Sequence, residues 1–161
     1  MIVDPQTPEI STVSADWLTS GPDRAKVGVT EMQSVEAVTL SQLIGRFGVP
    51  DYIKIDVEGF ETPVLRGLHI PVKHVSIEFH TTEMEEARER CGILNALGPY
   101  RFNYTLSNTY QLRLRQWALV NDLFEDLNSI RRDRRRPQWG DIFAKREGDV
   151  PSIVQKSAAA Q

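Results

Sequence analysis

The stretch YIKIDVEGFETPVLRGL, residues 52–68, decides the fold of this chain. Its first half is a nearly continuous apolar run made of Tyr52, Ile53, Ile55 and Val57. Such a run is typical of a strand that is covered on both faces, as in parallel sheets with helices on each side. Acids follow where this strand should leave the core, namely Asp56, Glu58 and Glu61. Because ligands of open α/β sheets bind beyond the carboxyl ends of the strands, these acids form a candidate site.

A structural interpretation of the same acids stays open. Strand ends also carry acids simply because they face water. Glu61 or Thr62 could serve only to cap a helix that begins at Pro63, since proline suits the first helical position. The spacing alone does not separate a ligand site from a capped helix start.

The residues before this strand predict a helix and a turn. Thr39 and Gln42 have the spacing of a capping box. The apolar residues that follow at helical spacing are Leu40, Leu43, Ile44 and Phe47. Gly48 is suited to end the helix, and residues 49–51 would turn into the strand. Together these segments form one αβ unit.

The next strand is expected from His74 to His80. Alternation places Glu78 and His80 on one face of this strand. A strand that follows a strand–helix unit is expected to lie parallel beside the first, so both side chains should open onto the edge that carries Asp56 and Glu58. Glu78 would then fix the orientation of a catalytic imidazole. The alternative is that His80 is a hydrogen-bonded structural residue.

The rest of the chain predicts further helices and strands. Thr82 and Glu85 suggest a second capping box, and Cys91 is expected to be a half-buried helix residue. The expected elements are a helix over 83–97, a strand over 100–106, a helix over 116–130 and a last strand over 139–145. The acids in the first turn of the helix over 83–97 are Glu83, Glu85 and Glu86, and they are expected to be solvated.

Composition points to an ordinary globular protein in a reducing, cytoplasmic setting. The 161 residues are 40% hydrophobic and 25% charged, and the single cysteine excludes an intrachain disulfide framework. The first ten residues do not resemble a signal peptide, and no segment is apolar enough to cross a membrane. With a net charge of -3, nucleic acid is not expected as a partner. The arginine run 131–136 is typical of a solvated or disordered block, and recognition of an anionic substrate or polymer is the alternative.

Residues 38–68 resemble the signature of the FkbM-type methyltransferases. The matching positions are Lys54 to Gly59, Glu61 and Val64 to Gly67, and residues 139–144 resemble the family's last strand. The resemblance covers roughly residues 9–146. It implies an α/β fold with a partial Rossmann-like sheet, that of a class I methyltransferase, flanked by helices. We therefore expect an irregular segment over 1–34, the C-terminal part of a methyltransferase domain over 35–146 and a disordered tail over 147–161.

The cofactor half that this family implies is not evident in the sequence. Rossmann-like folds hold a nucleoside cofactor on a glycine-rich turn after the first strand. None of the ten glycines stands two residues from another. We therefore expect the sheet to lack its first strands and the chain alone to bind S-adenosylmethionine weakly or not at all. The strand over 52–57 would become an edge strand that a partner chain or self-association covers.

The resemblance implies methyl transfer from S-adenosylmethionine to a hydroxyl of a sugar or another metabolite. Asp56 would contact the substrate or the cofactor, Glu58 and His80 are candidate bases, and Glu78 would orient His80. Asp56, Glu58 and His80 are also of the type that holds a divalent metal. The alternative is a non-catalytic remnant or interaction module that completes its sheet on a partner chain.

Overall fold

The computed structural model describes residues 2–3, 31–107, 109, 111–133 and 138–148. Its centre is a sheet in the order β3 (Tyr52–Ile55), β4 (His74–His80), β6 (Trp139–Arg146) and β5 (Tyr100–Tyr104). β3 runs parallel to β4, whereas β6 is antiparallel to both β4 and β5. The expected α/β fold and the parallel pairing of the first two strands of this sheet are confirmed. Two short strands, β1 (Ile2–Val3) and β2 (Glu31–Met32), form a separate antiparallel pair.

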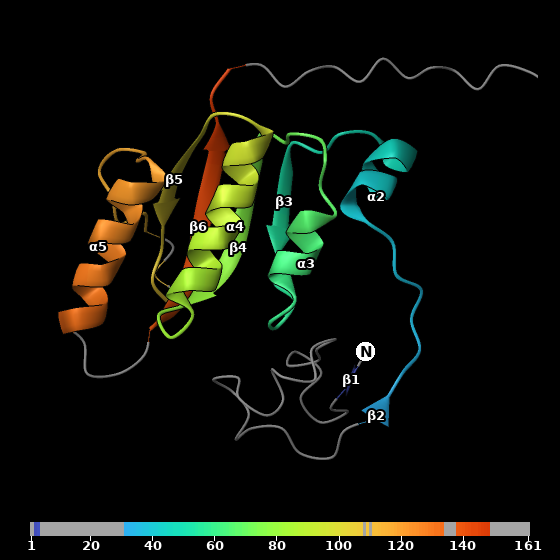
Figure 1. Ribbon diagram of the computed structural model, residues 1–161, viewed down its shortest axis with the longest axis horizontal. Coiled ribbons are helices and arrows are strands. Elements are labelled where there is room, and N and C mark those ends of the chain that lie inside the picture. The colour runs from blue at the N-terminus through green and yellow to red at the C-terminus, as the bar shows by residue number, and fades with distance from the viewer. Residues whose placement is uncertain (1, 4–30, 108, 110, 134–137, 149–161) are drawn as a thin grey trace, which may run out of the picture.

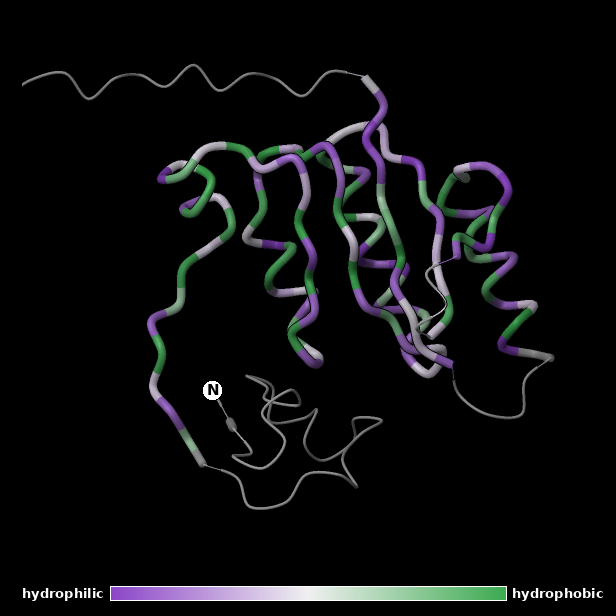
Figure 2. The backbone as a smooth tube through the Cα atoms, turned by 180° about the vertical axis from the view of Figure 1, so that it is seen from behind, coloured by the Kyte–Doolittle hydropathy of each residue, from purple (hydrophilic) through white to green (hydrophobic). Residues whose placement is uncertain are grey.

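The described helices are α2 (Leu40–Phe47), α3 (Glu61–Arg66), α4 (Met84–Leu97) and α5 (Val120–Asp133). In Figure 1, α3 and α4 lie in front of the sheet, and the view from behind in Figure 2 shows the strands in front of these helices. The core lies between the two layers. Its centre on β4 consists of Val75, Ile77 and Phe79, each at most 2% exposed. Burial of these alternate residues fixes which face of β4 meets the helices.

The prediction that the strand over 52–57 is covered on both faces is wrong. Only Ile55 of β3 is buried, Ile53 is half-buried, and Tyr52 and Lys54 are exposed. The reason is the position of β3 in the fold. It lies at one edge of the described sheet, and no described helix lies over the face that carries Tyr52 and Lys54.

One of the two predicted capping boxes forms. The backbone N–H of Gln42 donates to Thr39 Oγ1 at 3.2 Å, and the N–H of Thr39 donates to Gln42 Oε1 at 2.7 Å. The box at Thr82 is wrong, because α4 begins at Met84 without a side-chain cap. The backbone N–H of the preceding Thr81 donates a hydrogen bond to the carbonyl of Gln138 at 2.8 Å, just before β6. The chain therefore leaves β4 through a turn before the helix starts.

Other element bounds shift for identifiable reasons. The helix expected from residue 116 begins at Val120, because Ala118 exchanges two backbone hydrogen bonds of 2.8 Å with Phe102 of β5. α3 begins at Glu61 rather than Pro63, and proline is accommodated because the first N–H groups of a helix have no intrahelical partner. Cys91 is fully buried, not half-buried, and burial raises the pKa of its thiol to about 12.

Several predictions fall outside the described residues. They are most of the irregular segment expected over 1–34, most of the arginine run 131–136, and the tail beyond residue 148. Within the described residues, no helix has the length and apolarity that crossing a membrane requires.

Candidate functional site

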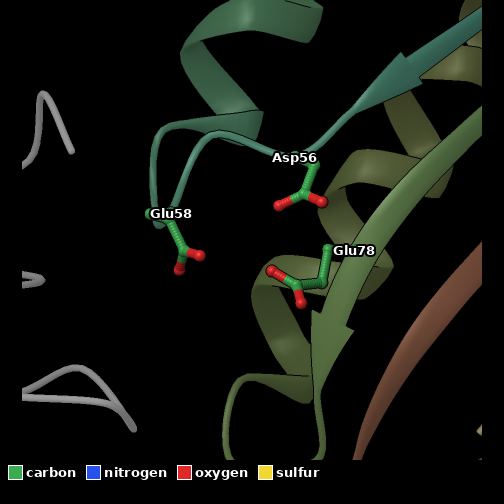
Figure 3. A group of neighbouring side chains, drawn as sticks. All are labelled: Asp56, Glu58 and Glu78. Carbon is green, nitrogen blue, oxygen red and sulfur yellow. The ribbon is translucent and has the colours of Figure 1, made fainter. Parts of the chain in front are cut away.

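Three carboxylates gather at the carboxyl ends of the two parallel strands. Asp56 follows β3, Glu58 lies in the turn between β3 and α3, and Glu78 lies near the end of β4. The pairing of Ile55 with Ile77 brings the end of β3 beside Glu78. One oxygen of each acid lies within 4.8 Å of the others, and Figure 3 shows the three side chains on one side of the sheet end. We call Asp56, Glu58 and Glu78 the acidic edge.

The turn that carries Glu58 has an unusual backbone. Glu58 has φ 49° and Gly59 has φ 89°. Glycine adopts such values freely, whereas the left-handed conformation is uncommon for a residue with a side chain. The surrounding contacts must therefore hold Glu58 in this conformation. The result is a tight reversal that leaves the Glu58 carboxylate on the side of Asp56 and Glu78.

Glu61 does not belong to the acidic edge, which corrects the expectation that it is one of the site's acids. Its side chain is buried, and Oε2 lies 3.0 Å from Nη2 of Arg90. Its Oε1 accepts hydrogen bonds from the backbone N–H groups of Val57, at 3.3 Å, and Gly59, at 3.1 Å. The helix-cap interpretation is also wrong, since the N-cap of α3 is Phe60 without a side-chain cap. Glu61 instead stabilises the turn.

His80 lies beside the acidic edge and contacts it through Glu78. Its Nε2 is 3.8 Å from Glu78 Oε2, a distance of an ion pair rather than a hydrogen bond. Burial by itself lowers the pKa of His80, but the nearby carboxylates of Glu78, Glu83 and Glu58 outweigh burial and raise it above 6.5. The imidazole therefore holds its proton to a higher pH than an isolated histidine and is a stronger base once it has lost it.

Two further charged residues, which are not among the predicted site residues, flank the acidic edge. Lys54 Nζ lies 3.0 Å from Asp56 Oδ2, and the hydrogen bond to Asp56 is the main cause that raises the pKa of Lys54. Asp141 of β6 is paired with Glu78. Burial, followed by the charges of Glu78 and Asp56, raises the pKa of Asp141, although Lys54 opposes the rise.

The signals for these two residues differ. Lys54 stands two residues before Asp56, so strand alternation already places both on one face. Asp141 lies far away in the sequence, and only the antiparallel pairing of β4 with β6 brings it beside Glu78. No local pattern indicates that contact.

The donor set fits a hard divalent cation better than the predicted set does. Carboxylate oxygens of Asp56, Glu58 and Glu78 suit Mg²⁺, Mn²⁺ or Ca²⁺. The predicted metal ligands were Asp56, Glu58 and His80. In the structure, the three residues whose ligand atoms lie close together include Glu78 in place of His80.

The part of the chain that the structure describes does not by itself show a complete cradle for S-adenosylmethionine. The described strands supply the acidic edge, but no described strand leads into a turn with two closely spaced glycines, and none of the ten glycines of the sequence stands two residues from another. The described residues therefore contain no glycine-rich turn of the kind that lets the backbone come close to a nucleoside cofactor.

A comparison with known protein families matches residues 6–126 to the "Methyltransferase FkbM domain". Searches of curated proteins and of solved structures found no match. The matched range contains β3, the acidic edge and α4, and it spans more than half of the 161 residues. The chain belongs to the FkbM methyltransferase family.

Proposed function

We propose that this chain supplies the acceptor-binding side of an O-methyltransferase that acts on a hydroxyl of a sugar or secondary metabolite. The observation that carries the proposal is the acidic edge, which lies at the carboxyl ends of parallel strands with His80 beside it. Carboxylates accept hydrogen bonds from hydroxyl groups, so the edge suits a hydroxylated ligand. Membership of a methyltransferase family supplies the class of reaction.

The proposed roles follow from where the side chains lie. Asp56 and Glu58 accept hydrogen bonds from the acceptor and fix its orientation, and Glu58 or His80 takes the proton of the hydroxyl that reacts. Glu78, 3.8 Å from His80, orients the imidazole and favours its charged form. When bound, S-adenosylmethionine would supply the methyl group. Because a protonated imidazole cannot accept a proton, a reaction that uses His80 should speed up as the pH rises through the pKa of that residue.

The test uses labelled S-adenosylmethionine at millimolar concentration, which offsets weak binding, and a panel of monosaccharides and hydroxylated metabolites. We expect methyl transfer by the unaltered chain and a loss of at least tenfold in Glu58→Gln and His80→Asn. Glu85→Gln is the control, because this exposed acid lies in the first turn of α4, outside the acidic edge. Equal activity of all variants would exclude the acidic edge as the site.

We further propose that the chain alone binds S-adenosylmethionine only weakly, because the spacing of its glycines does not provide the usual phosphate- and nucleoside-binding turn. Titration calorimetry with the purified chain tests this directly. A micromolar dissociation constant would contradict it and would require a different cofactor-binding surface.

A divalent metal is a second ligand that the acidic edge could hold. Three carboxylates so close together repel one another, and a cation would relieve this repulsion. MgCl₂ or MnCl₂ should then raise the melting temperature of the unaltered chain but not that of Asp56→Asn. If activity is found, loss on chelation and recovery with Mg²⁺ or Mn²⁺ would support a catalytic metal.

The second candidate function is an interaction module that completes its sheet on another chain. β3 is an edge strand of the described sheet, and the nearby Phe47 and Tyr52 are 73% and 48% exposed. The carbonyl of Asp51 accepts from His74, so alternation directs the backbone groups of Tyr52 and Lys54 away from β4. Light scattering should then show association that Lys54→Pro abolishes, because proline removes an outward N–H.

A cytoplasmic setting remains a prediction.

A further inference from the structure

Arg90 of α4 is a buried cation that contacts both sides of the candidate site. Its side chain is 6% exposed, and its Nη2 lies 3.0 Å from Glu61 Oε2. Its Nε donates to Thr62 Oγ1 at 3.2 Å, and its Nη1 donates to the backbone carbonyl of Glu78 at 3.2 Å. Glu83 Oε2 lies farther away, at 3.9 Å from Nη2. One guanidinium therefore joins α3, the end of β4 and the start of α4.

Glu61 extends this contact to the turn that carries Glu58. Its second carboxylate oxygen accepts from the N–H groups of Val57 and Gly59, the residues on either side of Glu58. Arg90 thus holds the backbone of Glu78 directly and the backbone around Glu58 through Glu61. Both of these acids belong to the acidic edge.

The acidic edge needs such support on electrostatic and conformational grounds. Its carboxylates lie within 4.8 Å of one another and repel, and Glu58 occupies the left-handed region with φ 49°. A planar guanidinium can donate in several directions at once, which a lysine ammonium on a flexible stem does less well. The Arg90–Glu61 pair is nearly dry, so its attraction is little screened.

We propose that Arg90 is a positioning residue that, through Glu61, keeps Glu58 opposite Glu78. The inference rests on the proposed function only for its catalytic meaning, since the positioning can be measured without activity. A second ion pair joins the same two helices and provides a matched control. Arg66 and Glu89 lie 2.6 Å apart at the surface, with side chains 66% and 45% exposed. The hydrogen bond of this pair runs from Arg66 Nη2 to Glu89 Oε1 between exposed side chains, so its loss should leave the turn around Glu58 unchanged.

The test compares Glu61→Gln, Arg90→Met and Arg66→Gln in the full chain. Amide hydrogen exchange and ¹⁵N order parameters report on the backbone of Val57 and Gly59, with the buried Ile77 as the internal reference. In Arg90→Met we expect exchange at least tenfold faster at the two turn amides, order parameters falling from about 0.85 to below about 0.6, and little change at Ile77. Glu61→Gln should show a smaller increase, because the amide oxygen of glutamine still accepts hydrogen bonds. Arg66→Gln should match the unaltered chain at all three positions.

A double variant separates positioning from stability. Replacing a buried ion pair with apolar residues of similar size is often neutral for folding, so Glu61→Met with Arg90→Met should fold even if a single variant does not. It should still show fast exchange at Val57 and Gly59, because no carboxylate accepts their N–H groups. Unchanged exchange in a folded double variant would overturn the proposal.

Kinetics then connects positioning to the proposed function. Once an acceptor is found, Arg90→Lys should lower kcat at least tenfold while the KM for the donor changes less, because Arg90 does not touch the donor in this proposal. Fast turn exchange together with unaltered kcat would leave the positioning role standing and would overturn the acidic edge as the active site.

Discussion

β3 and β4 lie side by side and look alike in the sequence, yet they differ in burial. β4 spans His74–His80 and is paired along both edges, by β3 and β6. β3 spans Tyr52–Ile55 and is paired, among the described strands, only with β4. Four of the seven β4 residues are buried, against one of four in β3. An apolar run therefore indicates a strand, but its neighbours decide how much of it leaves water.

The candidate site draws on both kinds of strand. Glu78 comes from the well-packed β4, whereas Asp56 and Glu58 follow the outer β3. The backbone on the Glu78 side of the acidic edge is therefore held by two neighbouring strands, whereas the backbone on the Asp56 and Glu58 side is held by one described strand. The contact of Arg90 and Glu61 with the turn compensates for this on the β3 side.

The largest effect should come from truncating the same residue type in the two strands. Ile77 is 2% exposed, whereas Ile53 is half-buried, and both pack on the helix-covered face. Ile77→Ala should lower the free energy of unfolding by about 2–5 kcal/mol, and Ile53→Ala by roughly half as much, because less surface and a smaller cavity are involved. Urea denaturation measures both. Equal losses would mean that β3 is covered as well as β4.

Two tyrosine hydroxyls allow a smaller version of this comparison. Tyr100 is buried, and its hydroxyl donates to the carbonyl of Val72 and accepts from the N–H of Val72 at 3.0 Å. Tyr52 on β3 is exposed, and its hydroxyl bonds to Ser76. Tyr100→Phe removes the hydrogen-bond partner of the buried N–H and carbonyl of Val72, and it should lower the free energy of unfolding by about 1–3 kcal/mol. Tyr52→Phe should lower it by about 0.5–1.5 kcal/mol. The reverse order in thermal denaturation would contradict this difference.

The carboxylates from the two sides should affect His80 unequally. Glu78 raises the pKa of His80 more than Glu58 does, so Glu78→Gln should lower this pKa more than Glu58→Gln. Titration of the imidazole by NMR measures both. Because the folded-state pKa lies above 6.5, the stability from His80 is fully present below that pH and is lost as the pH rises through the folded-state pKa. A flat stability profile across this window would contradict the assignment.

The smallest effect is expected at Asp141. Burial and the charges of Glu78 and Asp56 disfavour the ionised form of its carboxyl group. Its pKa is raised above 3.8 in the folded state, so its ionisation destabilises the fold as the pH rises above that value. Asp141→Asn should therefore raise the free energy of unfolding at neutral pH and leave it nearly unchanged below pH 3.8. Destabilisation by this variant at pH 7 would show that Lys54 outweighs the acids.

Much of the fold could be predicted from local patterns. Alternation gave β4 from His74 to His80 with both ends correct, and the Thr39 capping box forms as expected. These features depend on near neighbours in the sequence, whose spacing sets which face is buried and which N–H is capped. The acids that follow β3 and the family resemblance have the same local origin, and the family is confirmed.

The tertiary structure decided what distant residues do to one another. The sequence by itself determined that acids stand at the end of a strand, but only the packing of α4 against α3 placed Arg90 against Glu61 and removed Glu61 from the acidic edge. In the same way, the antiparallel entry of β6 beside β4 brought Asp141 to Glu78. The physical reason is that charge interactions depend on distance in space and on exclusion of water, and neither can be read from spacing along the chain.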